Sequence, residues 1–349
     1  MSYKSTHSTT IDNGKLFGAS TKKETARVVL LAVPWEVTTS YGSGTSFGPT
    51  TILKASPQLD FYDYSFADAL HHGLHLENAD PSINVENERL KPLARQVIDE
   101  WDEKGKLSES GQRILKTINT ASRNVHETVY KKSLKLMDEG KIPAVIGGDH
   151  SSPYGLIKAL CERHPQQLGI LHIDAHADLR KTYQGFEHSH ASIMRNVMEL
   201  ETPPKQLTQV GIRDYCQEEW DFIEEHPAIT TFFDRGNKKR QLSGASWDQI
   251  CSDIVATLPE LVYLSFDIDG LSPDNCPNTG TPVPGGLSFS EVVYLMEKVV
   301  RSGRKIVGFD LVEVAPGETD WDGNIGARLV YQLCGWSLAS QKLQDLRDE

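Results

Sequence analysis

Short apolar runs rich in β-branched residues alternate along the chain with longer stretches in which apolar residues recur every three or four positions. The first pattern is typical of buried strands and the second of amphipathic helices. We expect strands at residues 28–33, 144–146, 168–173, 209–212, 230–233, 261–266 and 305–309. We expect helices near residues 153–163, 190–200, 247–258, 289–302 and 324–339. Strands that are apolar on both faces occur in parallel sheets covered by helices on both sides, so this alternation predicts an α/β sandwich in one domain.

Two segments depart from this alternation. Residues 1–25 are rich in Ser, Thr and Lys and show no periodicity, so we expect a polar N-terminal arm ahead of a single domain at 26–349. Residues 72–113 are charge-rich, and we interpret them as an excursion from the sheet that is partly helical around 90–101.

Composition restricts the partners of the chain. Of its 349 residues, 36 are Lys or Arg and 48 are Asp or Glu, which gives a net charge of −12, and the basic residues are nowhere clustered. This distribution argues against a nucleic-acid or anionic-membrane partner and favours a cationic small-molecule substrate. The five cysteines are scattered singly, which argues against a zinc–thiolate site and fits a reducing compartment. No apolar run near the start is long enough to span a bilayer, and we expect a cytoplasmic protein.

Acids and histidines directly follow four of the predicted strands. The segments that carry them are GGDHS at 147–151, DAHAD at 174–178, DID at 267–269 and DLVE at 310–313. In open α/β sheets the carboxyl ends of the strands face the ligand crevice, so these segments are expected to meet there. Residues two apart on an extended chain point to the same side, which lets Asp174, His176 and Asp178 converge. The same spacing relates Asp267 to Asp269.

With His150 added, four carboxylates and two imidazoles surround one crevice. Buried carboxylates at this density raise one another's pKa unless positive charge compensates them, and two divalent cations would do so. Mn²⁺ suits a carboxylate-rich site with few imidazoles, and Ni²⁺, Co²⁺ and Zn²⁺ are its rivals. The two ions would lie roughly 3.5 to 4 Å apart and would generate a hydroxide nucleophile near neutral pH.

Single members of these segments have simpler interpretations. An Asp at a strand end often caps a helix, and we leave Asp149 and Ser151 with a structural role of this kind. His172 is expected to be a packed strand histidine that points away from His176. Taken together, however, a DxHxD and a DxD segment on separate strands, with a histidine after a third strand, indicate a metal site.

The chain resembles the ureohydrolase superfamily of arginases and agmatinases, and six segments carry the likeness. They are TSYGSGTSFGP at 39–49, GGDHS at 147–151, DAHAD at 174–178, SFDIDG at 265–270, TGTP at 279–282 and DLVEVAP at 310–316. The likeness covers about residues 28–336. It implies a three-layer α/β/α sandwich with a mostly parallel sheet of about eight strands, and assembly as a homotrimer or homohexamer. It also implies hydrolysis of a guanidino compound to urea and an amine.

The resemblance also implies roles for individual residues. One Mn²⁺ would be held by His150, Asp174, Asp178 and Asp267, and the other by Asp174, His176, Asp267 and Asp269. Glu313 corresponds to the acid that clamps the guanidinium, and Thr281 to a threonine that lines the guanidinium pocket. Asp178 would also orient the hydroxide. His190 corresponds to the proton shuttle of the family, with His188 as a competitor for this role.

The resemblance is less specific for the substrate. Residues 178–195 are similar to many agmatinases and lack the Asn and Ser with which arginases bind an amino-acid carboxylate, so agmatine is the first expectation. Arg180 could instead contact an anionic tail, such as that of guanidinobutyrate or formimidoylglutamate, or could form a structural ion pair. Ser272 and Asn278 depart from the common pattern and would reshape the pocket wall. Arginine and free guanidine are further alternatives.

Two other functions are compatible with this resemblance. A single-zinc amide hydrolase like the deacetylases would bind one ion, and the second set of ligands, which includes His176 and Asp269, argues against it. A non-catalytic binding protein descended from a ureohydrolase should have lost ligands, whereas all six are present here.

Overall fold

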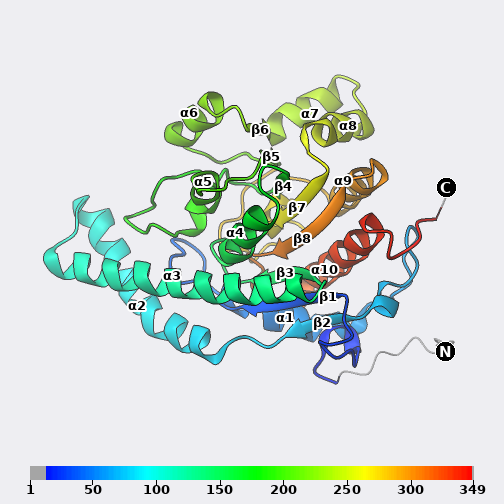
Figure 1. Ribbon diagram of the computed structural model, residues 1–349. Coiled ribbons are helices and arrows are strands. Elements are labelled where there is room, and N and C mark those ends of the chain that lie inside the picture. Colours follow the sequence, from blue (N-terminus) through cyan, green and yellow to red (C-terminus); the bar gives the residue numbers. More distant parts are fainter. Residues whose placement is uncertain (1–12, 348–349) are drawn as a thin grey trace.

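The computed structural model describes residues 13–347, which fold around one eight-stranded sheet in which every pair of neighbouring strands is parallel (Figure 1). The strands are β1 (Val28–Val33), β2 (Leu74–Glu77), β3 (Ile142–Gly147), β4 (Leu168–Ile173), β5 (Gln206–Val210), β6 (Ile229–Phe232), β7 (Leu261–Phe266) and β8 (Lys305–Leu311). Their order across the sheet is β2-β1-β3-β8-β7-β4-β5-β6. Each of the seven strands predicted from the sequence overlaps one of these, and the strand that was missed, β2, lies at an edge.

Helices cover both faces of this sheet. They are α1 (Gly48–Ala55), α2 (Pro81–Lys104), α3 (Glu109–Asp138), α4 (Tyr154–Arg163), α5 (Ile193–Met198), α6 (Gln217–Glu225), α7 (Asp234–Leu242), α8 (Trp247–Thr257), α9 (Phe289–Arg301) and α10 (Trp321–Ser340). One core lies between the sheet and α1, α8, α9 and α10, and a second lies between the opposite face and α2 to α5. The predicted three-layer α/β/α sandwich is therefore confirmed.

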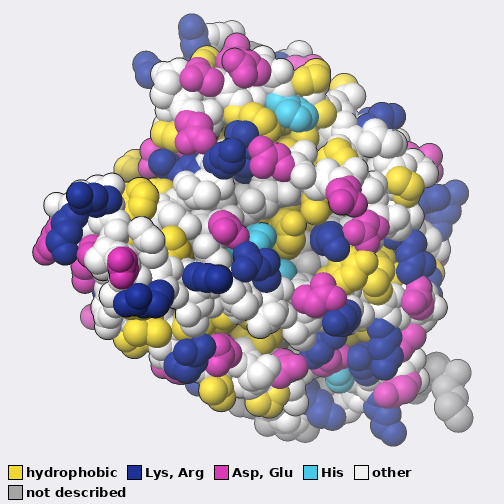
Figure 2. Space-filling model, turned by 60° about the vertical axis from the view of Figure 1, so that its left-hand side comes forward, with side chains coloured by type: hydrophobic (Ala, Val, Ile, Leu, Met, Phe, Trp, Pro, Cys, Tyr) yellow, Lys and Arg dark blue, Asp and Glu magenta, His cyan; other side chains and the backbone are white. Residues whose placement is uncertain are grey.

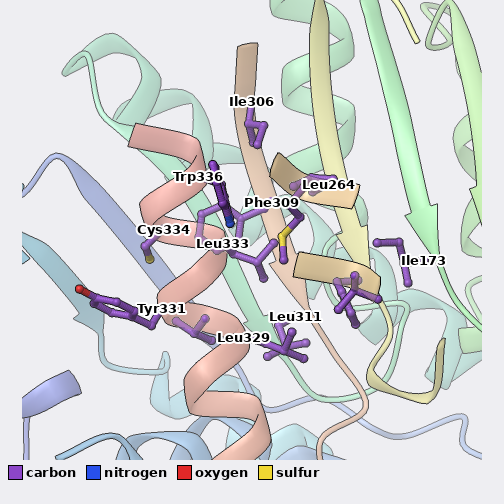
Figure 3. Packing of buried hydrophobic residues seen from close by; sticks show 14 of the residues in the cluster. Ile173, Leu264, Ile306, Phe309, Leu311, Leu329, Tyr331, Leu333, Cys334 and Trp336 are labelled. Carbon is purple, nitrogen blue, oxygen red and sulfur yellow. The ribbon is translucent and has the colours of Figure 1, made fainter. Parts of the chain in front are cut away.

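The first core is built from strand residues that meet the long helix α10 (Figure 3). Leu264 and Phe309 extend from the sheet toward Leu333 and Trp336 of the helix, and all four side chains are fully buried. Burying one large apolar side chain stabilises a fold by about 1.5 to 3 kcal/mol. The packing of this layer therefore stabilises the central strands.

Local sequence explains where these helices begin. At the start of α9, the Ser288 hydroxyl accepts a hydrogen bond from the backbone N–H of Glu291 (3.2 Å), and the Glu291 carboxylate accepts one from the backbone N–H of Ser288 (2.8 Å). This reciprocal capping box satisfies two N–H groups that the helix leaves free. The buried residues Val292, Leu295 and Val299 then recur every three or four positions and face the sheet.

The charge-rich segment 72–113 forms β2, α2 and the first turn of α3, and the two helices make a long hairpin (Figure 1). Its helical part is longer than the predicted 90–101, because α2 spans Pro81–Lys104 and α3 begins at Glu109. The buried stripe of α3 includes Ile118, Val125 and Val129, while its other faces carry the charged residues. On the face seen in Figure 2, Lys and Arg side chains are interspersed with Asp and Glu.

Residues 1–12 of the expected N-terminal arm lie outside the described residues. In the remainder of that arm, Leu16 and Phe17 are buried. The Phe17 ring meets the rings of Phe61 and Tyr331 edge-on, with centroids 5.7 and 5.5 Å apart. Within 13–347, no helix combines the length and the apolar character needed to cross a membrane.

The topology gathers four strand ends in the middle of the sheet. β3, β8, β7 and β4 are consecutive neighbours there, although they are far apart along the chain. Because all the strands are parallel, the carboxyl ends of these four open on the same edge. The segments with the candidate chemistry directly follow these strands.

Candidate metal centre and active site

The structure brings the predicted metal ligands together at this edge. His150 follows β3, Asp174, His176 and Asp178 follow β4, and Asp267 and Asp269 follow β7. Five of the six are buried, and the side chain of His176 is 23% exposed. They form two overlapping clusters that share Asp174.

His150 is the centre of the first cluster. Its Nδ1 lies 3.0 Å from Asp174 Oδ2, 3.0 Å from Asp178 Oδ2 and 3.3 Å from Asp267 Oδ2. Although three carboxylate oxygens surround this nitrogen, it makes no hydrogen bond of good geometry among the described residues. One imidazole nitrogen and several carboxylate oxygens facing a common point form a donor set that suits a divalent cation.

The second cluster is centred on His176. Its Nδ1 lies 3.1 Å from Asp269 Oδ2 and 3.5 Å from Asp174 Oδ1. The other oxygen of Asp269 accepts a hydrogen bond from the backbone N–H of Ala175 (3.0 Å), and Asp267 Oδ1 accepts one from the backbone N–H of Asp269 (2.9 Å). Backbone groups thus fix the orientation of both carboxylates that follow β7.

The electrostatics of these clusters call for added positive charge. Burial raises the pKa of Asp178 to about 6, with the neighbouring Asp174 as the next cause. Burial, followed by Asp269 and Asp174, also raises the pKa of Asp267 well above its usual value. Although burial disfavours the imidazolium, the surrounding carboxylates raise the pKa of His150 well above its usual value. Bound divalent cations would let every carboxylate stay ionised at neutral pH, so the residues present fit a metal centre.

His172 differs from the expectation. Its Nε2 lies 2.8 Å from Asp174 Oδ2, so the side chain points toward the site and groups with the candidate ligands. It is a buried residue of β4, as predicted, but its side chain does not point away from the site. The sequence contained a signal for this orientation of His172, because residues two apart on an extended chain, such as His172 and Asp174, point to the same side. The Gln209 side chain lies 3.0 Å from its other ring nitrogen.

A hydrogen-bond network that supports the His150 ring was not predicted from the sequence. His150 Nε2 lies 3.0 Å from the Ser265 hydroxyl, which donates to Asp310 Oδ2 (2.9 Å). The Tyr263 hydroxyl donates to the same carboxylate oxygen (2.6 Å). Groups of this kind orient a metal-binding histidine and fix which of its nitrogens is free to bind. Asp310 stood in a matched segment, but nothing in the sequence indicated its partners.

Two of the candidate residues have backbone angles that are uncommon for residues other than glycine. The φ angle is +53° at Asp178 and +61° at Glu313. Such conformations cost of the order of 1 to 3 kcal/mol and persist only where the surroundings enforce them. At Asp178 the enforcing contacts are visible, because its carbonyl accepts hydrogen bonds from the backbone N–H groups of Met194 (3.0 Å) and Arg195 (3.2 Å).

A pocket opens beside the first cluster. Residues 39–42 form one wall, and the others are formed by His190, Gly280, Thr281 and Glu313. Glu313 Oε1 accepts a hydrogen bond from the backbone N–H of His150 (3.1 Å), whereas Oε2 is buried with no partner among the described residues. Burial, then the nearby Asp267, raises the pKa of Glu313 well above its usual value. The free oxygen can therefore accept hydrogen bonds from a cationic ligand, whose charge would restore the ionised form.

The two candidate proton shuttles lie in different surroundings. His190 lines the pocket, and its pKa is lowered to about 4 by burial and then by His176 and His150. The His188 ring packs instead against His126 (centroids 4.8 Å apart) and Tyr154 (5.4 Å). His190 is therefore the one that reaches the space beside Glu313.

Arg180 lies outside the described lining of this pocket. Its Nε is 3.8 Å from a carboxylate oxygen of Glu219, and its guanidinium lies over the Tyr183 ring at 4.9 Å. The segment that leads to His190 is also tied to α3. The backbone N–H of Glu187 donates to the Asn119 side chain (3.2 Å).

His126 gives a test of the folded state by pH. Burial, then the neighbouring His188, lowers its pKa well below the ordinary 6.5, so the folded protein favours the neutral ring. The unfolded chain binds a proton more readily, and stability is therefore complete above about pH 6.5 and falls below it. Between about pH 7.5 and about pH 5.5, this group should therefore lower the free energy of unfolding as the pH falls. Urea unfolding of metal-saturated wild type and His126→Phe measures this, and equal pH dependences would contradict it.

Comparison with known proteins defines the class of this one. The chain belongs to the arginase family, whose family model matches residues 26–337. It is therefore a hydrolase of the arginase and agmatinase type, acting on the C–N bonds of amidines, as the six segments indicated.

Several individual proteins of this family are similar to the chain over most of its length. The chain is 31% identical to an N(1)-aminopropylagmatine ureohydrolase of Thermus thermophilus, over 89% of this chain and 90% of that one. It is 30% identical to agmatinase of Bacillus anthracis, over 93% and 97%. Among solved structures it is similar to agmatine ureohydrolase of Thermoplasma volcanium, with a TM-score of 0.71 and 25% identity over 97% and 96% of the two chains.

Proposed function

We propose that this protein hydrolyses agmatine to putrescine and urea at a centre of two Mn²⁺ ions. The observation that carries the proposal is the free, buried Glu313 oxygen in a pocket that adjoins the carboxylate cluster. No Lys or Arg stands among the described residues that line this pocket, so it is suited to a cation. The agmatinases among the relatives support the same assignment.

The metal ions are assigned to the two clusters. One set of ligands is His150, Asp174, Asp178 and Asp267. The other is Asp174, His176 and Asp269, to which the family resemblance adds Asp267. When bound, two such ions supply a hydroxide nucleophile near neutral pH and stabilise developing negative charge. We propose Mn²⁺ because oxygen donors dominate the set, with Ni²⁺, Co²⁺ and Zn²⁺ as the rivals.

The residues of the chain would bind and orient the substrate and move protons. Glu313 Oε2 accepts hydrogen bonds from the guanidinium and holds its carbon beside the two clusters. Asp178 would accept a hydrogen bond from the nucleophile and so orient it, as the family resemblance implies. In the net reaction, water adds its oxygen to the guanidinium carbon, the bond from that carbon to the alkyl nitrogen breaks, and urea forms. His190, on the pocket wall, passes the proton with which the amine leaves as an ammonium ion.

A longer substrate of the same class is the second candidate. The N(1)-aminopropylagmatine ureohydrolase of Thermus thermophilus is about as similar to this chain as the agmatinase of Bacillus anthracis. N(1)-aminopropylagmatine is therefore included among the substrates to be tested. Both compounds carry a cationic tail. Arg180 is assigned to a structural ion pair with Glu219 and would leave that tail unopposed.

The test is a substrate panel with an Arg180→Ala variant. Wild type loaded with Mn²⁺ should give the highest kcat/KM for agmatine among agmatine, N(1)-aminopropylagmatine, arginine, 4-guanidinobutyrate, formimidoylglutamate and guanidine. Arg180→Ala should leave the ratio of agmatine to 4-guanidinobutyrate within about threefold, because a group that does not meet the tail changes neither barrier. Arg195→Ala, which removes a neighbouring ion pair with Glu199, is the matched control.

Two results would overturn the proposal. The first is a preference of wild type for 4-guanidinobutyrate that is selectively lost in Arg180→Ala, which would show that the Arg180 side chain contacts the substrate tail. The loss of this charged hydrogen bond would then reduce the binding free energy of 4-guanidinobutyrate by about 1.5 to 3 kcal/mol. A higher kcat/KM for N(1)-aminopropylagmatine than for agmatine would replace the substrate and leave the reaction as proposed.

A further inference from the structure

Glu36 organises the loop that contains one wall of the pocket. Its side chain is fully buried, and Oε2 accepts hydrogen bonds from the backbone N–H groups of Gly44 (2.8 Å) and Ser46 (2.9 Å) and from the Thr45 hydroxyl (3.0 Å). The carbonyl of Glu36 accepts a further bond from the Thr39 hydroxyl (3.1 Å). One buried residue therefore closes this loop.

The hairpin helix α2 holds Glu36 from the opposite side. The Lys91 ammonium forms an ion pair with Oε1, and the Asn87 side chain accepts a hydrogen bond from the backbone N–H of Glu36 (2.8 Å). Asn87 and Lys91 are four residues apart and so lie on the same face of the helix. Asn87 is buried, and the Lys91 side chain is 30% exposed.

The charge on Glu36 depends on this contact. Burial acts to raise its pKa, but the contacts with Lys91 and with the N–H of Ser46 outweigh burial and hold the pKa below its usual value. Lys91 is its one ion-pair partner among the described residues. Removing a single partner from a buried ion pair leaves an uncompensated charge, which is far more damaging than the loss of an exposed pair.

The loop meets the other side of the pocket through glycine backbones. The N–H of Gly42 donates to the carbonyl oxygen of Gly280 (3.0 Å). A Cβ on Gly42 would lie 2.5 Å from that oxygen, and a Cβ on Gly280 would lie 3.0 Å from Glu313 Oε2. No side chain separates the two walls here, so a shift of the loop directly changes the space above the Glu313 carboxylate.

We infer that Lys91 and Asn87 are positioning residues that act through Glu36 to fix the pocket wall at 39–42 above Glu313. The inference rests on the proposed function, because it takes this pocket as the place where the guanidino substrate binds. According to this inference, helix α2 of the hairpin contributes to substrate affinity through Lys91 and Asn87. The wall contacts substrate and breaks no bond, so its displacement should affect KM more than kcat.

Lys91→Met tests the inference, with Lys91→Arg as the conservative variant. Arg89→Met is the matched control, since it removes an exposed ion pair with Glu86 from the same helix. Lys91→Met should raise KM for agmatine by about 10- to 100-fold, the effect of one charged hydrogen bond. Its kcat should stay within about threefold, and its metal content should be unchanged. Lys91→Arg should recover most of the affinity, and Arg89→Met should resemble wild type.

Hydrogen exchange gives a readout that does not depend on the substrate. The amides of Gly44 and Ser46 bond to Glu36, so in metal-loaded Lys91→Met they should exchange about tenfold faster or more than in wild type. In the double variant Glu36→Gln/Lys91→Met no buried charge is left unpaired. This variant should exchange more slowly than Lys91→Met alone, which separates the ion pair from a general loss of folding.

The outcomes distinguish this inference from the proposed function. Unchanged exchange in Lys91→Met overturns the inference, and so does faster exchange with an unchanged KM. A double variant that exchanges as fast as Lys91→Met also overturns it. If wild type fails to hydrolyse agmatine, the proposed function fails. KM is then measured for the panel compound that is hydrolysed, while the exchange result stands by itself.

Discussion

Asp267→Ala should leave the protein unable to retain its metal ions and should lower kcat/KM for agmatine by about 10³-fold or more. Asp267 is assigned to both ligand sets, and its carboxylate lies 3.3 Å from His150 Nδ1 at the centre of the first cluster. Losing the several kcal/mol with which metal ions stabilise the transition state corresponds to a factor of this size. Emission spectrometry of the dialysed protein and urea release measure the two effects.

Asp274→Ala is the control for this change, because Asp274 lies in the following loop and is exposed. It should keep two ions per chain and near wild-type activity. An Asp267→Ala protein that retained both ions and full activity would remove Asp267 from the ligand sets. A wild type that binds one ion per chain at metal saturation would contradict the dinuclear centre itself.

His190→Ala should lower kcat by about 10²- to 10⁴-fold while both metal ions stay bound, since this is the range that a positioned proton donor supplies. The side chain lines the pocket and is not assigned to the metal ions. Small external imidazoles should restore part of the activity by occupying the space that the ring vacates. Steady-state kinetics with and without added imidazole, together with a metal count, measure the result.

His188→Ala is the matched variant for this experiment. Its ring packs on His126 and Tyr154, so it should affect stability more than kcat. If His188→Ala shows the large loss of kcat and His190→Ala does not, the two roles are exchanged. Loss of metal from His190→Ala would contradict its assignment as a proton shuttle.

The sequence predicted most of the fold because local pattern and topology agree in the central strands. Strands such as β4 and β7 are apolar on both faces, and their carboxyl ends lead directly into the acidic segments. The edge strand β2 was missed because it is short and only partly buried. α3 was missed because a long helix with one narrow buried stripe has the composition of an exposed segment.

The candidate site likewise contains residues that could be predicted from the sequence and residues that could not. Ligand pairs such as Asp174 and His176 share a segment, so their spacing could be read directly from the chain. The groups that support them come from distant positions, as with Asp310 beside Ser265, or Lys91 beside Glu36. Contacts of this kind depend on how helices and strands are placed in space, and a single sequence contains no local signal for them.

The position of β8 in the sheet has a consequence for the stability of the fold. Among the strands of residues 13–347, β8 comes last along the chain, yet it lies between β3 and β7 in the sheet. Without β8 the strand order would leave two separate halves, β2-β1-β3 and β7-β4-β5-β6, with His150 after a strand of one half and the carboxylates of its cluster after strands of the other. The candidate metal centre therefore has ligands on both sides of β8. Ions bound by the proposed ligands would link the two halves and stabilise the complete sheet, because a ligand that binds only the folded state stabilises it.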